Sequence, residues 1–208
     1  MTDQAREVRE FWFGRLPLSA RALAARMRFW FPDDARSELT RQLDDAIQVR
    51  FEPLMQQAAR GELDAWADSP RRRLSLILLL DQFPRNVYRG TARAFASDEQ
   101  ALALALSGIQ SGAEGALDVV ERIFFYMPLQ HAESREVQEE SVAAYRRLLS
   151  EAPSELHGHF ASSLRSAENH RGIIERFGRF PYRNQVLGRS STPQERDWLS
   201  AGGRSFGQ

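Results

Sequence analysis

The chain has 208 residues, 42% of them hydrophobic and 27% charged, which is the composition of an ordinary globular protein with one buried core. Its 28 basic residues balance 28 acidic ones, and this formal net charge of zero argues against a nucleic-acid-binding protein. The sequence contains no cysteine and no lysine, which excludes disulfides, cysteine-ligated zinc and Schiff-base lysines.

The start of the chain is polar and shows no apolar signal-peptide region. The longest strongly apolar run, residues 74–80, is too short to cross a bilayer. We therefore expect a cytoplasmic protein with no membrane partner.

Helical periodicity recurs along the chain, whereas the alternating pattern of strands is scarce. The predicted helices cover about residues 3–13, 33–60, 70–83, 97–109, 133–149 and 155–177, and a last one begins after residue 192. These segments predict an all-α fold: one domain over residues 1–208, built as an array of antiparallel helical hairpins with short connections.

Helix punctuation supports these boundaries. Gly14 and Gly61 are placed to end the first two helices, and Pro53 is expected to kink or divide the second. Ser69 and the proline after it are typical of an N-cap followed by the first helical position. The run Thr-Pro-Gln-Glu at 192–195 is a capping box that opens the last helix.

A short phrase occurs twice in the chain. Residues 81–90 read Asp-Gln-Phe-Pro-Arg-Asn-Val-Tyr-Arg-Gly, and residues 178–189 read Gly-Arg-Phe-Pro-Tyr-Arg-Asn-Gln-Val-Leu-Gly-Arg. Because proline lacks an N–H and biases the preceding residue away from helical geometry, we predict that both copies are turns at helix ends. Each turn would present arginine forks and an asparagine amide.

These side chains are the predicted ligand-binding residues, since arginine pairs with carboxylate or phosphate through two parallel hydrogen bonds. If the two copies meet in space, they would hold a small anionic molecule or an acidic peptide end. The charge contacts would come from Arg85, Arg89, Arg183 and Asn184, with Asn86 and Arg179 in support and Arg189 nearby. In the structural alternative, the same arginines pair with acids such as Asp81, Glu133 or Glu175 and tie helices together.

His131, Glu133 and His170 are the candidates for acid/base chemistry, because histidine titrates near neutrality and a carboxylate can orient it. His131 follows a predicted turn at 127–129, and His170 lies on the apolar stripe of its helix, where a core role is the common outcome. A metal site built from these three residues is the alternative, but we predict no metal and no cofactor.

The aromatic residues near predicted helix ends are expected to pack between helices, with substrate stacking as the alternative. They are Trp12, Phe13, Trp30, Phe31 and Trp66.

Six phrases, at residues 11–14, 61–66, 78–86, 124–133, 176–184 and 187–195, resemble a bacterial family catalogued as domain of unknown function 924. That family is grouped with tetratricopeptide-like all-α folds, so the resemblance implies such a fold but no activity. Two positions depart from it: Tyr182 stands where the family usually has histidine, and Ala132 where it usually has serine. Any chemistry that such a histidine carries in relatives would be lost or altered here.

Three functional hypotheses therefore stand after the sequence. The first is a binder of a small anion or acidic peptide in a cavity lined by arginine and asparagine. The second is a hydrolase-type or other acid/base enzyme that uses His131, Glu133 or His170 beside the same arginines. The third is a structural or protein-interaction scaffold without a small-molecule site. The sequence specifies neither the ligand nor the oligomeric state.

Overall fold

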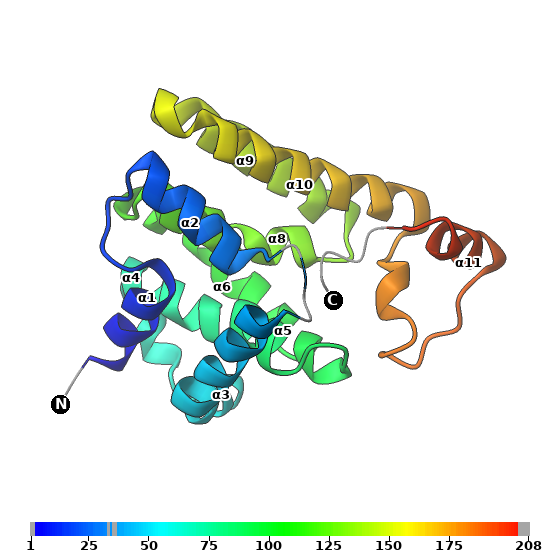
Figure 1. Ribbon diagram of the computed structural model, residues 1–208, viewed down its shortest axis with the longest axis horizontal. Coiled ribbons are helices and arrows are strands. Elements are labelled where there is room, and N and C mark those ends of the chain that lie inside the picture. The colour runs from blue at the N-terminus through cyan, green and yellow to red at the C-terminus, as the bar shows by residue number, and fades with distance from the viewer. Residues whose placement is uncertain (1–2, 33, 35–36, 204–208) are drawn as a thin grey trace.

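The computed structural model describes residues 3–32, 34 and 37–203, and this part of the chain is helical and contains no β-strand (Figure 1). Its α-helices are α1 (Gln4–Phe13), α2 (Ala20–Trp30), α3 (Glu38–Ala59), α4 (Pro70–Ile77), α5 (Phe83–Val87), α6 (Asp98–Gln110), α7 (Val119–Phe125), α8 (Met127–His131), α9 (Arg135–Glu151), α10 (His157–Phe177) and α11 (Pro193–Ser200). A π-helix, η2 (Leu78–Gln82), joins α4 to α5, and the 3-10 helices are η1 (Asp64–Asp68), η3 (Ala92–Phe95), η4 (Ala113–Ala116), η5 (Ser154–Leu156) and η6 (Pro181–Arg183). The predicted all-α class is confirmed.

Several predicted boundaries match the structure. Gly14 follows the last residue of α1 with a φ of 72°, a conformation that glycine adopts without strain. Thr192 and Glu195 form both halves of the capping box that opens α11. Pro53 lies inside α3 without dividing it, and the first residues of the predicted 33–60 helix fall partly outside the described residues.

Two predictions of local structure are wrong, and the helices α2 and α7 were missed. The first Phe-Pro pair is not a turn, because α4, η2 and α5 follow one another without a break and Pro84 lies in the first turn of α5. Residues 127–129 are helical for the same reason, since Pro128 also lies in a first helical turn, where no N–H is required. Helix α2 was not predicted, although Ser19 caps it by accepting from the N–H of Ala22.

The core is dominated by aromatic rings from distant parts of the sequence. The Trp12 ring lies 5.5 Å from both Phe83 and Phe124, and the Trp30 ring lies 4.7 Å from Phe124. Trp12, Phe13, Trp30 and Trp66 are buried, as the packing interpretation expected, whereas Phe31 is 42% exposed.

The C-terminal third of the described chain forms a distinct layer. Helices α9 and α10 pack along each other as a hairpin, and η6 and α11 lie beyond the end of α10 (Figure 1). This end has a small core of its own, made by Ile173, Ile174 and Phe180. The tetratricopeptide-like arrangement of these hairpins stays a prediction. Among the described residues, none of the helices has the length and apolar character needed to cross a bilayer.

Candidate functional site

The π-helix between α4 and α5 places a carboxylate in the interior. In η2 the N–H of Phe83 donates to the carbonyl of Leu78, five residues earlier, which widens the helical turn just before Pro84. Asp81 lies in this segment and is fully buried. A buried carboxylate needs partners, and Gln82 supplies one by donating its amide to Asp81 Oδ2.

His131 is the second partner of Asp81. Its Nδ1 lies 2.6 Å from Asp81 Oδ1, although the two residues are 50 positions apart in the sequence. His131 ends the short helix α8, and Gln138 of α9 fixes that end by donating Nε2 to the carbonyls of Leu129 (3.1 Å), Gln130 (2.8 Å) and Ala132 (2.8 Å). The imidazole is therefore held from both sides, by a buried carboxylate and by an anchored backbone.

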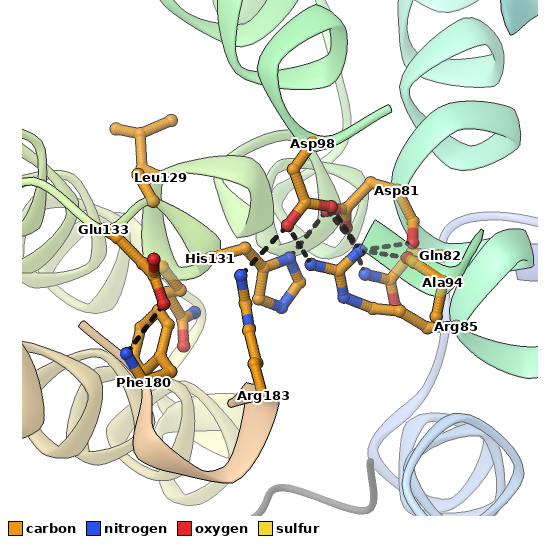
Figure 2. Close-up of polar contacts among 12 residues, drawn as sticks. Asp81, Gln82, Arg85, Ala94, Asp98, Leu129, His131, Glu133, Phe180 and Arg183 are labelled. Carbon is orange, nitrogen blue, oxygen red and sulfur yellow. Dashed lines mark hydrogen bonds and ion pairs between the residues drawn. The ribbon is translucent and has the colours of Figure 1, made fainter. Parts of the chain in front are cut away.

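The two copies of the repeated phrase meet at one carboxylate, Asp98, the first residue of α6 (Figure 2). Arg85 donates to both Asp98 oxygens, from Nη1 at 2.8 Å and from Nη2 at 2.9 Å. Arg183 donates from Nη1 to Asp98 Oδ2 at 3.2 Å. Both guanidinium groups also lie over the ring of Phe95, so this ion triad is packed as well as paired.

The other predicted ligand-binding side chains contact other acids and not Asp98. Asn86 donates to Asp44 at 2.8 Å, and Arg89 pairs with the same carboxylate. Arg179 and Asn184 both donate to Glu195 in the C-terminal segment. The structure thus joins Arg85 to Arg183 but does not bring all six side chains to one surface.

Glu133 does not contact His131. It accepts from Arg189 (2.6 Å) and from the backbone N–H of Phe180 (2.8 Å), and so it ties the C-terminal segment to the start of α9. Burial opposes its ionisation, but these hydrogen bonds outweigh burial and lower the pKa of Glu133.

His170 lies beside the His131 ring, with its centroid 6.1 Å away. Its Nδ1 is 2.8 Å from the carbonyl of Ser166, which can only accept, so Nδ1 carries the proton. Burial, together with a smaller effect of the nearby His131, lowers the pKa of His170 to about 3. His170 is therefore neutral at pH 7.

The charge state of the Asp81–His131 pair follows from its surroundings. Burial alone would raise the pKa of Asp81, but Arg85 and the hydrogen bonds from His131 and Gln82 outweigh it and lower that pKa. Burial and Arg85 lower the pKa of His131, against a smaller opposing effect of Asp81. At pH 7 the pair is thus a carboxylate and a neutral imidazole, with Nδ1–H donating to Asp81 and the lone pair on Nε2.

A cavity of about 380 Å³ lies next to this pair. Its polar side is formed by side chains from α5, α8 and α10, including Arg85, Gln130, His131, Ser166 and His170. Its apolar side comes mainly from α2 and the residues after it, and from α7 and α8. This combination of an apolar wall with a few convergent polar groups is typical of small-molecule sites.

Sequence reasoning missed the two acids that organise the site. Asp81 was considered only as a salt-bridge partner and Asp98 only as part of a predicted helix start, although Asp81 is the first residue of the repeated phrase. Gln138 carried no signal in the sequence beyond its place in a predicted helix. In the described ranges, no cluster of three or more histidine, aspartate and glutamate side chains is suited to hold a metal ion.

Comparison with known proteins agrees with the resemblance seen in the sequence. A family model described as "Bacterial protein of unknown function (DUF924)" matches residues 8–203. A solved structure, of the protein of unknown function ATU0120 from Agrobacterium tumefaciens, is similar to this chain with a TM-score of 0.71 and 39% identity. The similarity covers 88% of this chain and 100% of that one. No curated protein matches the chain.

Proposed function

We propose a function for this chain, which belongs to the bacterial family of unknown function DUF924, from the cavity beside Asp81 and His131. The cavity binds a small molecule, and His131 acts there as a general base that Asp81 orients. The observation that carries this proposal is the 2.6 Å contact between Nδ1 of His131, which lines the cavity, and the fully buried carboxylate of Asp81.

The proton chemistry supports this role. A carboxylate that accepts from Nδ1–H fixes the tautomer, leaves Nε2 as a proton acceptor and stabilises the imidazolium that forms when Nε2 takes a proton. His131 lines the cavity, and its Nδ1 is occupied by Asp81. Nε2 is consequently the ring atom that meets a ligand hydroxyl or a water molecule.

The anion-binding alternative has weaker support. An arginine attracts an anion most strongly when its fork is not already engaged, and both Nη atoms of Arg85 donate to Asp98. An incoming anion would have to displace that carboxylate or share the site with it, and like charges in a poorly hydrated site repel. Arg85 is better placed to stabilise the negative charge of Asp81.

The tautomer of His131 is a direct test that requires no substrate. In the 15N-histidine NMR spectrum at pH 7, we expect Nε2 of His131 to be unprotonated and Nδ1 to carry the proton, as in a neutral imidazole bound to a carboxylate. In Asp81→Asn this preference is lost or reversed. A charged imidazole at pH 7, or a proton on Nε2 in the unaltered protein, would contradict the proposal.

Turnover provides the functional half of the same test. Mixtures of small metabolites are incubated with the protein and followed by mass spectrometry, and the rate for any converted compound is compared between variants. Removal of a general base typically costs about 10²- to 10⁴-fold, so we expect a loss of that size in His131→Gln. His157→Gln, at an exposed histidine that begins α10, is the matched control and should keep the full rate.

A further inference from the structure

One wall of the cavity is apolar and another is polar, and this difference limits the kinds of molecule that can bind there. We infer that the cavity takes a neutral molecule with a flat apolar part and a hydroxyl or amide hydrogen-bond donor at one end. The inference rests on the proposed role of His131, because the donor end is the part that would meet Nε2.

The apolar wall is suited to a flat ring. Phe31 lines the cavity, is 42% exposed, and lies parallel to Phe124 with 3° between the ring planes. Its neighbour Trp30 is held in place because its Nε1 donates to the carbonyl of Trp12 at 3.0 Å. An exposed aromatic face on a fixed support favours stacking with a second ring, and Met27 and Met127 add adaptable thioether contacts.

The opposite wall offers neutral hydrogen-bonding groups. Ser166 donates its hydroxyl to Gln130 Oε1 at 3.0 Å, so its oxygen can still accept from a ligand. The neutral imidazole of His131 contributes its Nε2 acceptor to the same cavity. Two acceptors on the same wall require a donor from the ligand, which an alcohol or an amide supplies and a carboxylate does not.

The charged groups at the cavity already have partners of opposite charge. The arginines among its described lining residues are Arg85 and Arg89, which pair with Asp98 and Asp44 respectively. Asp81, the third acid, is bonded to His131 and Gln82 and lies 3.3 Å from Arg85. A charged ligand would therefore meet opposing charges that are already satisfied, and it would lose its own hydration without a partner in return.

A series of matched probes tests this inference. They are 2-phenylethanol, the anion phenylacetate and the cation phenethylamine, which share one ring and differ in charge at the end of the side chain. Binding is followed by NMR of 13C-methyl methionine, because Met27 and Met127 line the cavity whereas Met55 is buried in α3 and serves as the internal reference. We expect 2-phenylethanol to shift the first two signals and leave Met55 unchanged, with an affinity at least about tenfold above that of either charged probe.

Two variants locate the binding. Phe31→Ala removes the ring platform and should weaken the binding of 2-phenylethanol by about five- to tenfold. Leu187→Ala removes another exposed large apolar side chain, on the C-terminal segment, and should leave the affinity unchanged.

Three outcomes would overturn the inference: tighter binding of a charged probe, an affinity that Phe31→Ala does not alter, or no shift of Met27 and Met127 by any probe up to its solubility limit. Each of these leaves the tautomer of His131 untouched. The binding experiment therefore tests the class of ligand, and the NMR experiment on the tautomer separately tests the role of His131 as a base.

Discussion

At the scale of single residues, the site depends on groups whose protonation is set by burial. His131 and His170 lie 6.1 Å apart between ring centroids, and the pKa of each is lowered, chiefly by burial. Two adjacent neutral histidines in the interior stabilise the folded protein only while both remain uncharged. We therefore expect acid to destabilise the folded protein through these two histidines.

The stability of the protein should fall as the pH decreases below the ordinary histidine range. His170 has a folded pKa of about 3, against about 6.5 in the unfolded chain, so between these values the unfolded state binds more protons. Its contribution is complete above pH 6.5 and declines by at most about 1.4 kcal/mol per pH unit below it. His131, Arg85 and Arg183 are the charged or titratable groups that act on it, and all of them disfavour the charged ring.

The measurement is urea unfolding at pH 7, 6 and 5. In His170→Phe the free energy of unfolding should depend less steeply on pH than in the unaltered protein, whereas His157→Gln should keep the original slope. Equal slopes in the unaltered protein and in His170→Phe would contradict the assignment.

At the scale of elements, the arrangement of α8 against α9 decides where His131 points. Helix α8 is only five residues long, and so short a helix is too unstable by itself to hold its C-terminal end in place. Gln138, which is fully buried in α9, holds this end in place because its side-chain amide donates to three backbone carbonyls there.

Gln138→Leu keeps the approximate volume but removes this donor, so the carbonyls of Gln130 and Ala132 lose a partner, whereas the Leu129 carbonyl still accepts from the N–H of Ala132. Unsatisfied buried groups cost about 1–3 kcal/mol each, so we expect a loss of about 2–4 kcal/mol in the free energy of unfolding, since partial relaxation returns some of the cost. Amide hydrogen exchange should also accelerate at residues 127–132, and the His131 tautomer preference should weaken. Gln48→Leu, on the exposed face of α3, is the control and should change stability by less than about 0.5 kcal/mol.

The π-helix η2 has the same positioning role for Asp81. The wider turn lets α4 and α5 remain one continuous helical segment across Pro84, so the carboxylate stays in the interior. A turn at Phe83, as the sequence suggested, would have interrupted the segment next to that carboxylate.

At the scale of the whole molecule, one aromatic cluster connects α1, α2, α3, α5 and α7. Phe83 is fully buried within it and lies against Trp12 and Phe51. Phe83→Ala should destabilise the fold by about 3–5 kcal/mol, because the cavity left by a large ring closes only in part. Phe31→Ala, with the same change at a half-exposed ring, should cost much less, as measured by urea unfolding.

Most of the helices could be predicted from sequence because amphipathic periodicity and capping residues are local properties. The capping box at α11 and the glycine after α1 are examples. Pro84 and Pro128 misled the prediction because a proline in the first turn of a helix and a proline that ends one look alike without knowledge of the next turn. Helix α2 was overlooked although its capping residue, Ser19, was visible in the sequence.

The candidate site was predictable only in part. The arginines of the repeated phrase were visible, and Arg85 and Arg183 do approach each other. Their meeting point, Asp98, is 85 residues before Arg183, and Asp81 is 50 residues before His131. Such pairings depend on how helices cross in space, which no local pattern specifies.

Because two arginines share Asp98, the structure limits which substitutions can accumulate at these positions during evolution. One carboxylate holds two arginines from distant parts of the chain, so the loss of Asp98 removes the acid that Arg183 pairs with, and the loss of either arginine weakens the pairing of Asp98. Single substitutions at positions 85, 98 and 183 should therefore be removed by selection even where the ligand is unaffected. In lineages that do change them, the three positions should be replaced together, as one inherited unit.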